Sequence, residues 1–375
     1  MAEKIKPIHP FLSEGKILFP VLLLSGIGMI MVYSASSSIS MENHNSAIYY
    51  MQKQGLFFGI SLCAMFITAS LPYKLYKKFS YLIFFLIIAL LVAVLVPKLN
   101  MKAGGANRWL NLGGLTFQPA ELTKLLLILF LGYSLSKKQE MIKLFFIGFF
   151  PHALLFSFLA VLIIFQPDFG TIVVLGLITW GMMFIAGVKI IHLLSPTPLL
   201  IPVIYFWVYK VEYRMERIMT FLNPWNDPSD AGYQVTHSLK AFGSGGIFGK
   251  GLGLGMQKMH YLPEPHTDFI FSIIGEEFGL AGVLTILSLY LVLLLKGIDI
   301  AKTSDTAFGA ITASGITIYI GIQVIINTGV ALGALPTKGL TLPFISYGGT
   351  SLLVNMAAMG ILMNIGASQK NEQTV

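Results

Sequence analysis

Cysteine and charged residues are scarce in this chain of 375 residues. The single cysteine, Cys63, lies in an apolar run, so a disulfide bond within the chain is excluded and cysteine use says nothing about the redox compartment. Charged residues make up only 11% of the chain, hydrophobic residues make up 55%, and the mean hydropathy is +0.76. This composition excludes a soluble globular protein and predicts an integral membrane protein with many spans.

Two familiar kinds of segment are also absent. No cleavable signal peptide is evident, because the first apolar run begins near Lys16 and its length fits a retained span better. The glycine-rich stretch 243–255 resembles a phosphate-binding loop only superficially: Ser244 replaces the first glycine, and Gly251 follows Lys250 where Ser or Thr should bind magnesium. We therefore expect no nucleotide cofactor and no nucleic-acid partner, and we expect 243–255 to be a flexible or tightly turned loop.

The apolar runs have the length of helices that cross a bilayer rather than of barrel strands. They predict an all-α integral membrane protein, a single polytopic domain over residues 1–375 with about ten transmembrane helices and no internal repeat. A long outer loop, about 212–268, is expected between helices 7 and 8, and the polar tail, about 368–375, is expected to be disordered. The expected spans are residues 16–36, 53–71, 79–97, 118–136, 144–166, 169–188, 190–211, 269–295, 306–332 and 341–366.

Lysines in the short loops predict the orientation of these spans. If the N-terminus is cytoplasmic, all of these lysines lie on the cytoplasmic side of the membrane, as the positive-inside pattern requires. An even number of spans then places the C-terminus on the same side. These lysines are Lys4, Lys6, Lys16, Lys74, Lys77, Lys78, Lys137, Lys138, Lys143, Lys189, Lys296 and Lys302.

The long loop 212–268 is polar, rich in Gly and Pro, and far longer than a connector needs to be, which marks it as a functional segment. Basic residues gather on its side of the membrane, where the charge rule does not explain them. They are either solvated or headgroup-contacting surface residues, or a basic rim that meets a phosphate-bearing substrate. The set is Arg108, Arg214, Arg217, Lys240, Lys250, Lys258 and Lys338.

Carboxylates at the start of the eighth span are the second candidate feature. Asp268 stands just before an apolar run, so it should lie at the mouth of the span, half withdrawn from water. A carboxylate there can have the raised pKa that a general base needs, or it can simply cap the helix. Glu276 and Glu277 lie about two turns deeper, and at least one should face the bundle interior, because two carboxylates facing lipid would be costly.

Three further polar positions have both a structural and a functional interpretation. Glu121 and Lys124 are i and i+3 near the start of the fourth span, so we expect a salt bridge that is either purely structural or part of a substrate site. Asp168 is either the N-cap of the sixth span or a functional carboxylate or cation ligand. Trp109 follows a glycine-rich stretch and should lie at headgroup depth.

The stretch 333–351 has a Pro and Gly spacing that predicts irregular backbone at membrane depth, which is tolerated only against protein or a cavity. Composition, spacing and charge together predict a helical membrane protein with a polar, partly basic site containing carboxylates on its outer side. They do not name a reaction.

In this order the motifs resemble the SEDS family (shape, elongation, division and sporulation), the membrane-embedded peptidoglycan glycan polymerases. The match runs from Tyr33–Ser36 to Ser346–Gly349, nearly the whole chain, and comprises five long motifs with consistent spacing. The stretches 226–234, 257–264 and 333–339 favour a division member over an elongation member. A sporulation member resembles the division protein closely.

The resemblance implies a reaction in which disaccharides of lipid II are joined and undecaprenyl diphosphate is released. It implies that Asp268 is the general base on the attacking hydroxyl group. Cations should stabilise the leaving diphosphate, with or without a divalent metal ion such as Mg²⁺ or Mn²⁺. The candidate substrate-binding residues are Arg108, Trp109, Glu121, Lys124, Asp168, Arg214, Arg217, Lys258, His266, Thr267, Lys338 and Ser346.

The resemblance also implies partners and a location. The partners are a class B penicillin-binding protein, which is a transpeptidase with one membrane span, and other division proteins at the septum of the bacterial cytoplasmic (inner) membrane. Two alternatives remain: a lipid II flippase, which should place essential polar groups along a path near the midplane, and a non-catalytic scaffold. Charges crowd the outer rim in this sequence and no repeat is visible, which favours the enzyme, although Glu121, Lys124, Glu276 and Glu277 are consistent with a flippase.

Overall fold

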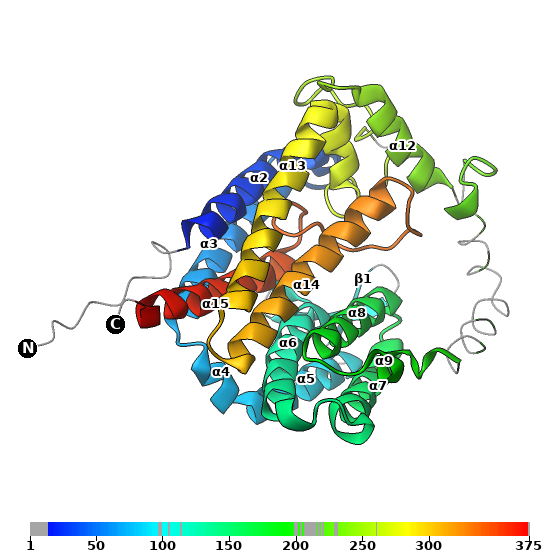
Figure 1. Ribbon diagram of the computed structural model, residues 1–375. Helices are drawn as coiled ribbons and strands as arrows, with labels where there is room; N and C mark the ends of the chain where they lie inside the picture. Colours follow the sequence, from blue (N-terminus) through cyan, green and yellow to red (C-terminus); the bar gives the residue numbers. More distant parts are fainter. Residues whose placement is uncertain are drawn as a thin grey trace, which may run out of the picture.

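The protein is a bundle of long helices with a smaller helix, α12, over one end (Figure 1). This computed structural model describes residues 14–96, 100–103, 106–112, 115–198, 221–228, 232–259 and 261–373, with the single positions 202, 205, 215 and 219. The helices are α2 (Gly15–His44), α3 (Tyr49–Ser70), α4 (Lys74–Lys78), α5 (Ser80–Leu95), α6 (Pro119–Lys137), α7 (Phe150–Ile164), α8 (Phe169–Ile185), α9 (Ile190–Leu194), α12 (Tyr233–Gly245), α13 (Ile270–Thr303), α14 (Ala307–Ala331) and α15 (Gly349–Gln373). A 3₁₀ turn, η1 (Gln139–Met141), and a π-helical turn, η2 (Phe145–Phe149), precede α7.

The expected all-α membrane architecture is confirmed. Seven described helices are long and apolar enough to cross a membrane, and two shorter apolar helices, α5 and α8, accompany them. The expected span 190–211 is described only in part: α9 ends at Leu194, and most positions from 199 onward lie outside the described residues.

Two boundaries differ from the expected ones. Helix α2 continues to His44, although we expected an end near residue 36, because the end of an apolar run does not by itself end a helix and no Gly or Pro follows before Asn45, which adopts the left-handed C-cap conformation. Helix α15 begins at Gly349 and continues to Gln373, so 341–348 is not helical, and residues 368–373 are helical rather than a disordered tail. The irregular backbone expected in this region is confirmed over 332–348, where Leu342, Phe344 and Ile345 are buried against the bundle.

A small antiparallel sheet, which we did not predict from the sequence, joins α5 to α6. Its strands β1 (Asn100–Ala103), β2 (Ala106–Leu112) and β3 (Leu115–Phe117) pair in that order. Leu110 of β2 is buried, and β2 packs on both α5 and α6. Arg108 also lies on β2, so the sheet fixes its position relative to the bundle.

The two acidic residues deep in α13 hold the loop 246–258 against this helix. The carboxylate of Glu276 accepts a bond from Lys250 Nζ at 2.8 Å and from the backbone N–H groups of Met256 and Gln257 at 2.9 and 3.0 Å. The carboxylate of Glu277 pairs with Lys258 Nζ at 2.6 Å. Both glutamates are fully buried, which confirms the expectation that at least one faces the interior.

The backbone of the same loop also enters a break in α13. Gly279 has φ 63° and ψ −160°, a conformation outside the helical region, and a Cβ there would lie 2.6 Å from the carbonyl atoms of Ile247. Four glycines of the loop, at 246, 249, 251 and 253, have positive φ, so the expected tightly turned loop is confirmed. Glycine at 279 is required both for its φ and for this close approach.

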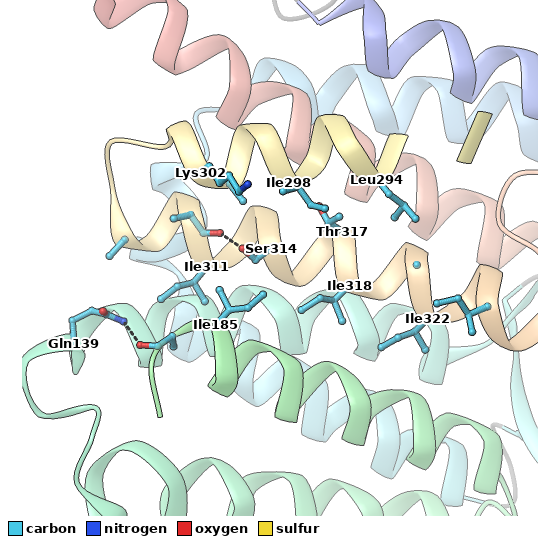
Figure 2. A pocket seen from close by; sticks show the side chains of 16 residues that line it. Gln139, Ile185, Leu294, Ile298, Lys302, Ile311, Ser314, Thr317, Ile318 and Ile322 are labelled. Carbon is cyan, nitrogen blue, oxygen red and sulfur yellow. Dashed lines mark hydrogen bonds between the residues drawn. The ribbon is translucent and has the colours of Figure 1, made fainter. Parts of the chain in front are cut away.

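Between α8, α13 and α14 runs an apolar groove of about 740 Å³ (Figure 2). Ile185 of α8, Leu294 and Ile298 of α13, and Ile311, Ile318 and Ile322 of α14 line it. Because these helices span the membrane, the groove is an apolar surface within the bilayer.

Replacing Gly279 by Ala should destabilise the protein far more than replacing Gly253 by Ala. Gly253 also has positive φ, but a Cβ there meets nothing within 4 Å, so only the backbone strain of about 1 kcal/mol is expected. At Gly279 the overlap with Ile247 adds to this strain, for a total loss of at least about 3 kcal/mol. Denaturant unfolding in detergent measures both, and equal losses would contradict the close approach.

Candidate functional site

Asp268 lies immediately before α13, at the end of the bundle that α12 covers. The interpretation of Asp268 as a helix cap is wrong: the N-cap is Phe269, and no side chain caps the helix. Within the described part of the chain, no hydrogen bond or ion pair occupies the Asp268 carboxylate. Burial, with a smaller contribution from the negative charge of Glu264, raises the pKa of Asp268 to about 7.

Asn327 of α14 holds the backbone on both sides of this carboxylate. Its Nδ2 donates to the carbonyl oxygen of Asp268 at 2.9 Å and to that of Leu340 at 2.6 Å. Next to Leu340, Gly339 faces the carboxylate, since a Cβ at this position would lie 2.8 Å from Asp268 Oδ2. The carboxylate is therefore fixed against the segment 332–348. Sequence reasoning missed Asn327, because one asparagine inside an apolar helix gives no distinctive signal.

The middle of this segment brings a cationic group to the site. Lys338 Nζ lies 4.6 Å from the centre of the Phe169 ring, at the start of α8. Burial lowers the pKa of Lys338, and the nearby Asp168 carboxylate opposes this shift. Arg108 of β2 contacts the turn between α7 and α8. It donates through Nε to the carbonyl oxygen of Gln166 at 3.2 Å and through Nη2 to that of Pro167. Arg108 and Lys338 thus flank the α7–α8 turn.

Asp168 is the N-cap of α8, as one of its two interpretations predicted. Its carboxylate accepts bonds from the backbone N–H of Thr171 at 3.2 Å and from the Thr171 hydroxyl at 2.9 Å. The same carboxylate lies close enough to Lys338 to influence it, so capping does not exclude a part in the site. Trp109, beside Arg108 on β2, is half-buried.

The C-terminal end of the segment 332–348 binds the backbone just ahead of Asp268. Ser346 Oγ donates to the carbonyl oxygen of Thr267 at 2.6 Å, and the N–H of Tyr347 donates to that of His266 at 2.9 Å. Gln54 of α3 is buried and fixes this end, because its Nε2 donates to the Ser346 carbonyl oxygen at 3.2 Å. The expected site residues His266, Thr267 and Ser346 are therefore brought together with Asp268.

The predicted salt bridge between Glu121 and Lys124 is confirmed at 2.6 Å. Both side chains are buried in the first turns of α6, and Lys124 Nζ lies 5.5 Å from the centre of the Tyr319 ring of α14. This pair contacts α14 inside the bundle rather than the Asp268 carboxylate.

Lys258 does not lie where its expected role in substrate binding requires. Its side chain is 4% exposed, and its ammonium group binds Glu277 and Ser34 Oγ, so in this structure it holds the loop rather than reaching a substrate diphosphate. The pairing could not be inferred because Ser34 is 224 residues away in the chain. The candidates Arg214 and Arg217 lie outside the described residues.

A divalent metal ion stays a prediction. Among the described residues, no three or more side chains of His, Cys, Asp or Glu gather in a way that could hold a metal ion. Mg²⁺ commonly binds through one or two carboxylates together with substrate phosphates, so a protein cage is not required. Asp168 and Asp268 are the carboxylates of this site that could contribute to such binding.

Curated relatives cover nearly the whole chain. The probable peptidoglycan glycosyltransferase FtsW of Geobacter sulfurreducens is 42% identical over 354 residues, which are 94% of this chain and 95% of that protein. The stage V sporulation protein E of Bacillus subtilis is 43% identical over 345 residues, which are 92% and 94% of the two chains.

Solved structures share the fold. A peptidoglycan synthase complex that coordinates polymerization and crosslinking contains a chain with a TM-score of 0.79 and 28% identity, covering 95% of this chain and 98% of that one. The rod shape determining protein RodA of Thermus thermophilus gives a TM-score of 0.70 with 27% identity, covering 94% and 96%. The family described as cell cycle protein, which joins FtsW, RodA and SpoVE, matches residues 16–371. The chain therefore belongs to this family of multi-pass membrane proteins, the SEDS peptidoglycan glycosyltransferases.

Proposed function

We infer that the protein is a peptidoglycan glycosyltransferase of the FtsW type, which polymerises glycan strands from lipid II in cell division. The observation that carries this function is the Asp268 carboxylate, which is half-buried, fixed by its backbone, and free of hydrogen bonds to the described residues. With a pKa of about 7 it can accept a proton at neutral pH, as a general base must.

The reaction we propose forms one glycosidic bond and breaks one bond to a diphosphate. Asp268 accepts the proton of the acceptor sugar's 4-hydroxyl group. At the same time, the oxygen of that hydroxyl group attacks the anomeric carbon of the donor. The electron pair of the cleaved carbon–oxygen bond leaves with undecaprenyl diphosphate. The protonated carboxyl group then loses its proton to water, which restores the base.

The negative charge that develops on the leaving diphosphate requires nearby cations. Lys338 and Arg108 are the described cations on the side of Asp268 that faces the α7–α8 turn. Arg108 presents a planar guanidinium group suited to two phosphate oxygens, and Lys338 supplies a mobile point charge. We propose that these two residues bind the diphosphate of the donor.

The flippase alternative rests on buried polar groups inside the bundle. Gln323 of α14 and the Glu121–Lys124 pair of α6 are buried there. A transport path needs such groups at the midplane. The fixed and unpaired carboxylate of Asp268 near the end of the bundle favours chemistry over transport.

We further propose that both termini are cytoplasmic, that the protein gathers at the septum of the bacterial inner membrane, and that its partner is a class B penicillin-binding protein. The lysine distribution supports the orientation. A single-span partner needs an apolar surface within the bilayer, and the groove between α8, α13 and α14 is one (Figure 2). We propose that the partner's span packs there.

Asp268→Asn and Asp268→Ala should abolish glycan polymerisation, because each removes the proton acceptor. A loss of about 10²- to 10⁴-fold in rate is expected for protein purified with its partner and supplied with lipid II. The matched control is Asp299→Asn, which removes an exposed carboxylate near the other end of α13 and should leave the rate unchanged. Glycan ladders from folded Asp268 variants at the wild-type rate would refute the role. Lipid II movement across sealed vesicles without ladders would favour the flippase.

The polymerisation rate should rise with pH through about 7 and level off above it, because only the deprotonated form of Asp268 accepts the proton. At pH 6 the rate should be about tenfold below the plateau. Glu264→Gln should move the midpoint to lower pH, since removing the Glu264 charge removes one cause of the raised pKa. The control is Glu140→Gln, an exposed site in η1. A Glu264→Gln profile identical to the wild type would contradict this assignment.

Ile318→Trp should weaken partner binding, because the larger side chain fills the groove (Figure 2). Recovery of the co-expressed transpeptidase on the purified protein should fall by roughly tenfold. Leu284→Trp places the same side chain on the exposed face of α13 outside the groove and should leave recovery unchanged. Equal recovery with both variants would place the partner elsewhere.

A further inference from the structure

A cluster of five ring side chains lies on one side of Asp268, and the proposed chemistry does not use it. This aromatic cluster consists of His44, Tyr49, Tyr50, His266 and Tyr347. His44 stacks on Tyr49 with ring centres 3.6 Å apart, and Tyr49 meets Tyr50 edge to face at 5.4 Å. Tyr50 contacts His266 at 4.7 Å and Tyr347 at 5.3 Å.

The aromatic cluster adjoins the catalytic carboxylate through two connections. His266 is two residues before Asp268 in the chain. Glu264 is close enough to influence both the Tyr50 hydroxyl and the Asp268 carboxylate, so these two groups share a neighbour. The aromatic cluster is therefore joined by its member His266 to the segment that carries Asp268.

The aromatic cluster and the cationic residues meet different parts of the segment 332–348. Lys338, near its middle, contacts Phe169 of α8, whereas Tyr347, at its end, packs on His266 and on Tyr50 of α3. Helices α3 and α8 lie on opposite sides of the bundle (Figure 1). Asp268 lies against Gly339, the residue after Lys338, and follows His266 of the aromatic cluster by two residues.

The rings remain partly accessible but are held firmly. His44 is exposed, and Tyr49, Tyr50 and Tyr347 are half-buried, so these rings are not simply core residues. Gln54 holds the backbone on both sides of Tyr347: it donates to the Ser346 carbonyl oxygen and accepts a bond from the Gly348 N–H at 3.3 Å. These contacts fix Tyr347 in place, while part of the aromatic cluster stays open to solvent.

The imidazole ring of His266 adds polar atoms to the aromatic cluster. Its side chain is 6% exposed, and its Nδ1 has no hydrogen-bond partner within the described part of the chain. Burial lowers the pKa of His266, so the ring is neutral at pH 7 and offers one donor and one acceptor. Lys53, whose Nζ lies 4.5 Å from the centre of the Tyr49 ring, adds a charged donor at the edge of the cluster.

We propose that the aromatic cluster is a saccharide-binding subsite for the acceptor sugar, opposite the cationic side that holds the donor diphosphate. The inference rests on the proposed function and names where one of its two substrates binds. The apolar C–H face of a pyranose ring matches the face of a tyrosine ring, while its hydroxyl and acetamido groups need hydrogen-bonding partners such as His266 and Lys53. An acceptor held here would present its hydroxyl group to Asp268.

The test uses the lipid-free disaccharide N-acetylglucosaminyl-N-acetylmuramic acid as a competitor of polymerisation. Tyr50→Ala and Tyr347→Ala should each raise its inhibition constant by about 3- to 10-fold, because each removes one stacking surface. Tyr50→Phe and Tyr347→Phe keep the ring and should stay within about twofold of the wild type. The control Tyr81→Ala removes a ring from an edge-to-face pair with Tyr133 on α5 and α6 and should leave inhibition unchanged.

Direct binding separates this inference from the proposed function. Saturation-transfer NMR with the disaccharide is carried out on Asp268→Asn protein, which keeps the aromatic cluster and lacks the base. Signal lost with an added Tyr347→Ala and retained with Tyr347→Phe supports the subsite even if the wild type forms no glycan ladders. Unchanged signal and unchanged inhibition in all tyrosine variants, from a wild type that polymerises, would overturn the subsite and leave the polymerase standing.

Discussion

The structure depends on two carboxylates placed inside a membrane helix. Glu276 and Glu277 are fully buried in α13, and each would be strongly destabilising there without a partner. The loop 246–258 supplies those partners as Lys250, Lys258 and two backbone N–H groups. Burying these charges therefore holds the loop on the helix. The break in α13 at Gly279 gives the backbone of the loop room to approach the helix. Truncating either glutamate would leave a buried lysine or unpaired N–H groups.

The site is assembled from segments that the anchored loop brings together. From Lys258 the chain runs ten residues to Asp268, so the ion pair of Lys258 with Glu277 sets where the segment that leads to Asp268 begins. At its end, Asn327 bonds to the carbonyl oxygens of Asp268 and Leu340 and joins this segment to 332–348. Asp268, the proposed general base, is thus held by backbone contacts, and its carboxylate is left free to accept a proton. This arrangement separates positioning from chemistry.

The segment 332–348 gives the site two chemically different sides. Its first part presents Lys338 beside Arg108 and the N-cap Asp168, a setting for a diphosphate. Its last part presents Tyr347 beside Tyr50 and His266, a setting for a sugar ring. Glycosyl transfer with inversion places the attacking hydroxyl group and the leaving diphosphate on opposite sides of the anomeric carbon, with the base beside the hydroxyl group. The irregular backbone is what allows one segment to reach both.

Local spacing and composition determined much of this protein. The membrane class, most spans, the Glu121–Lys124 pair, the Asp168 cap and the inward-facing glutamates all follow from contacts within one helix turn or from the cost of charge in lipid. The tertiary structure alone decided the partner of Lys258, the role of Asn327, the placing of the sheet and the aromatic cluster. These contacts join residues far apart in the chain, such as Ser34 and Glu277 at a separation of 243. No local periodicity encodes them, because helix packing selects which distant side chains meet.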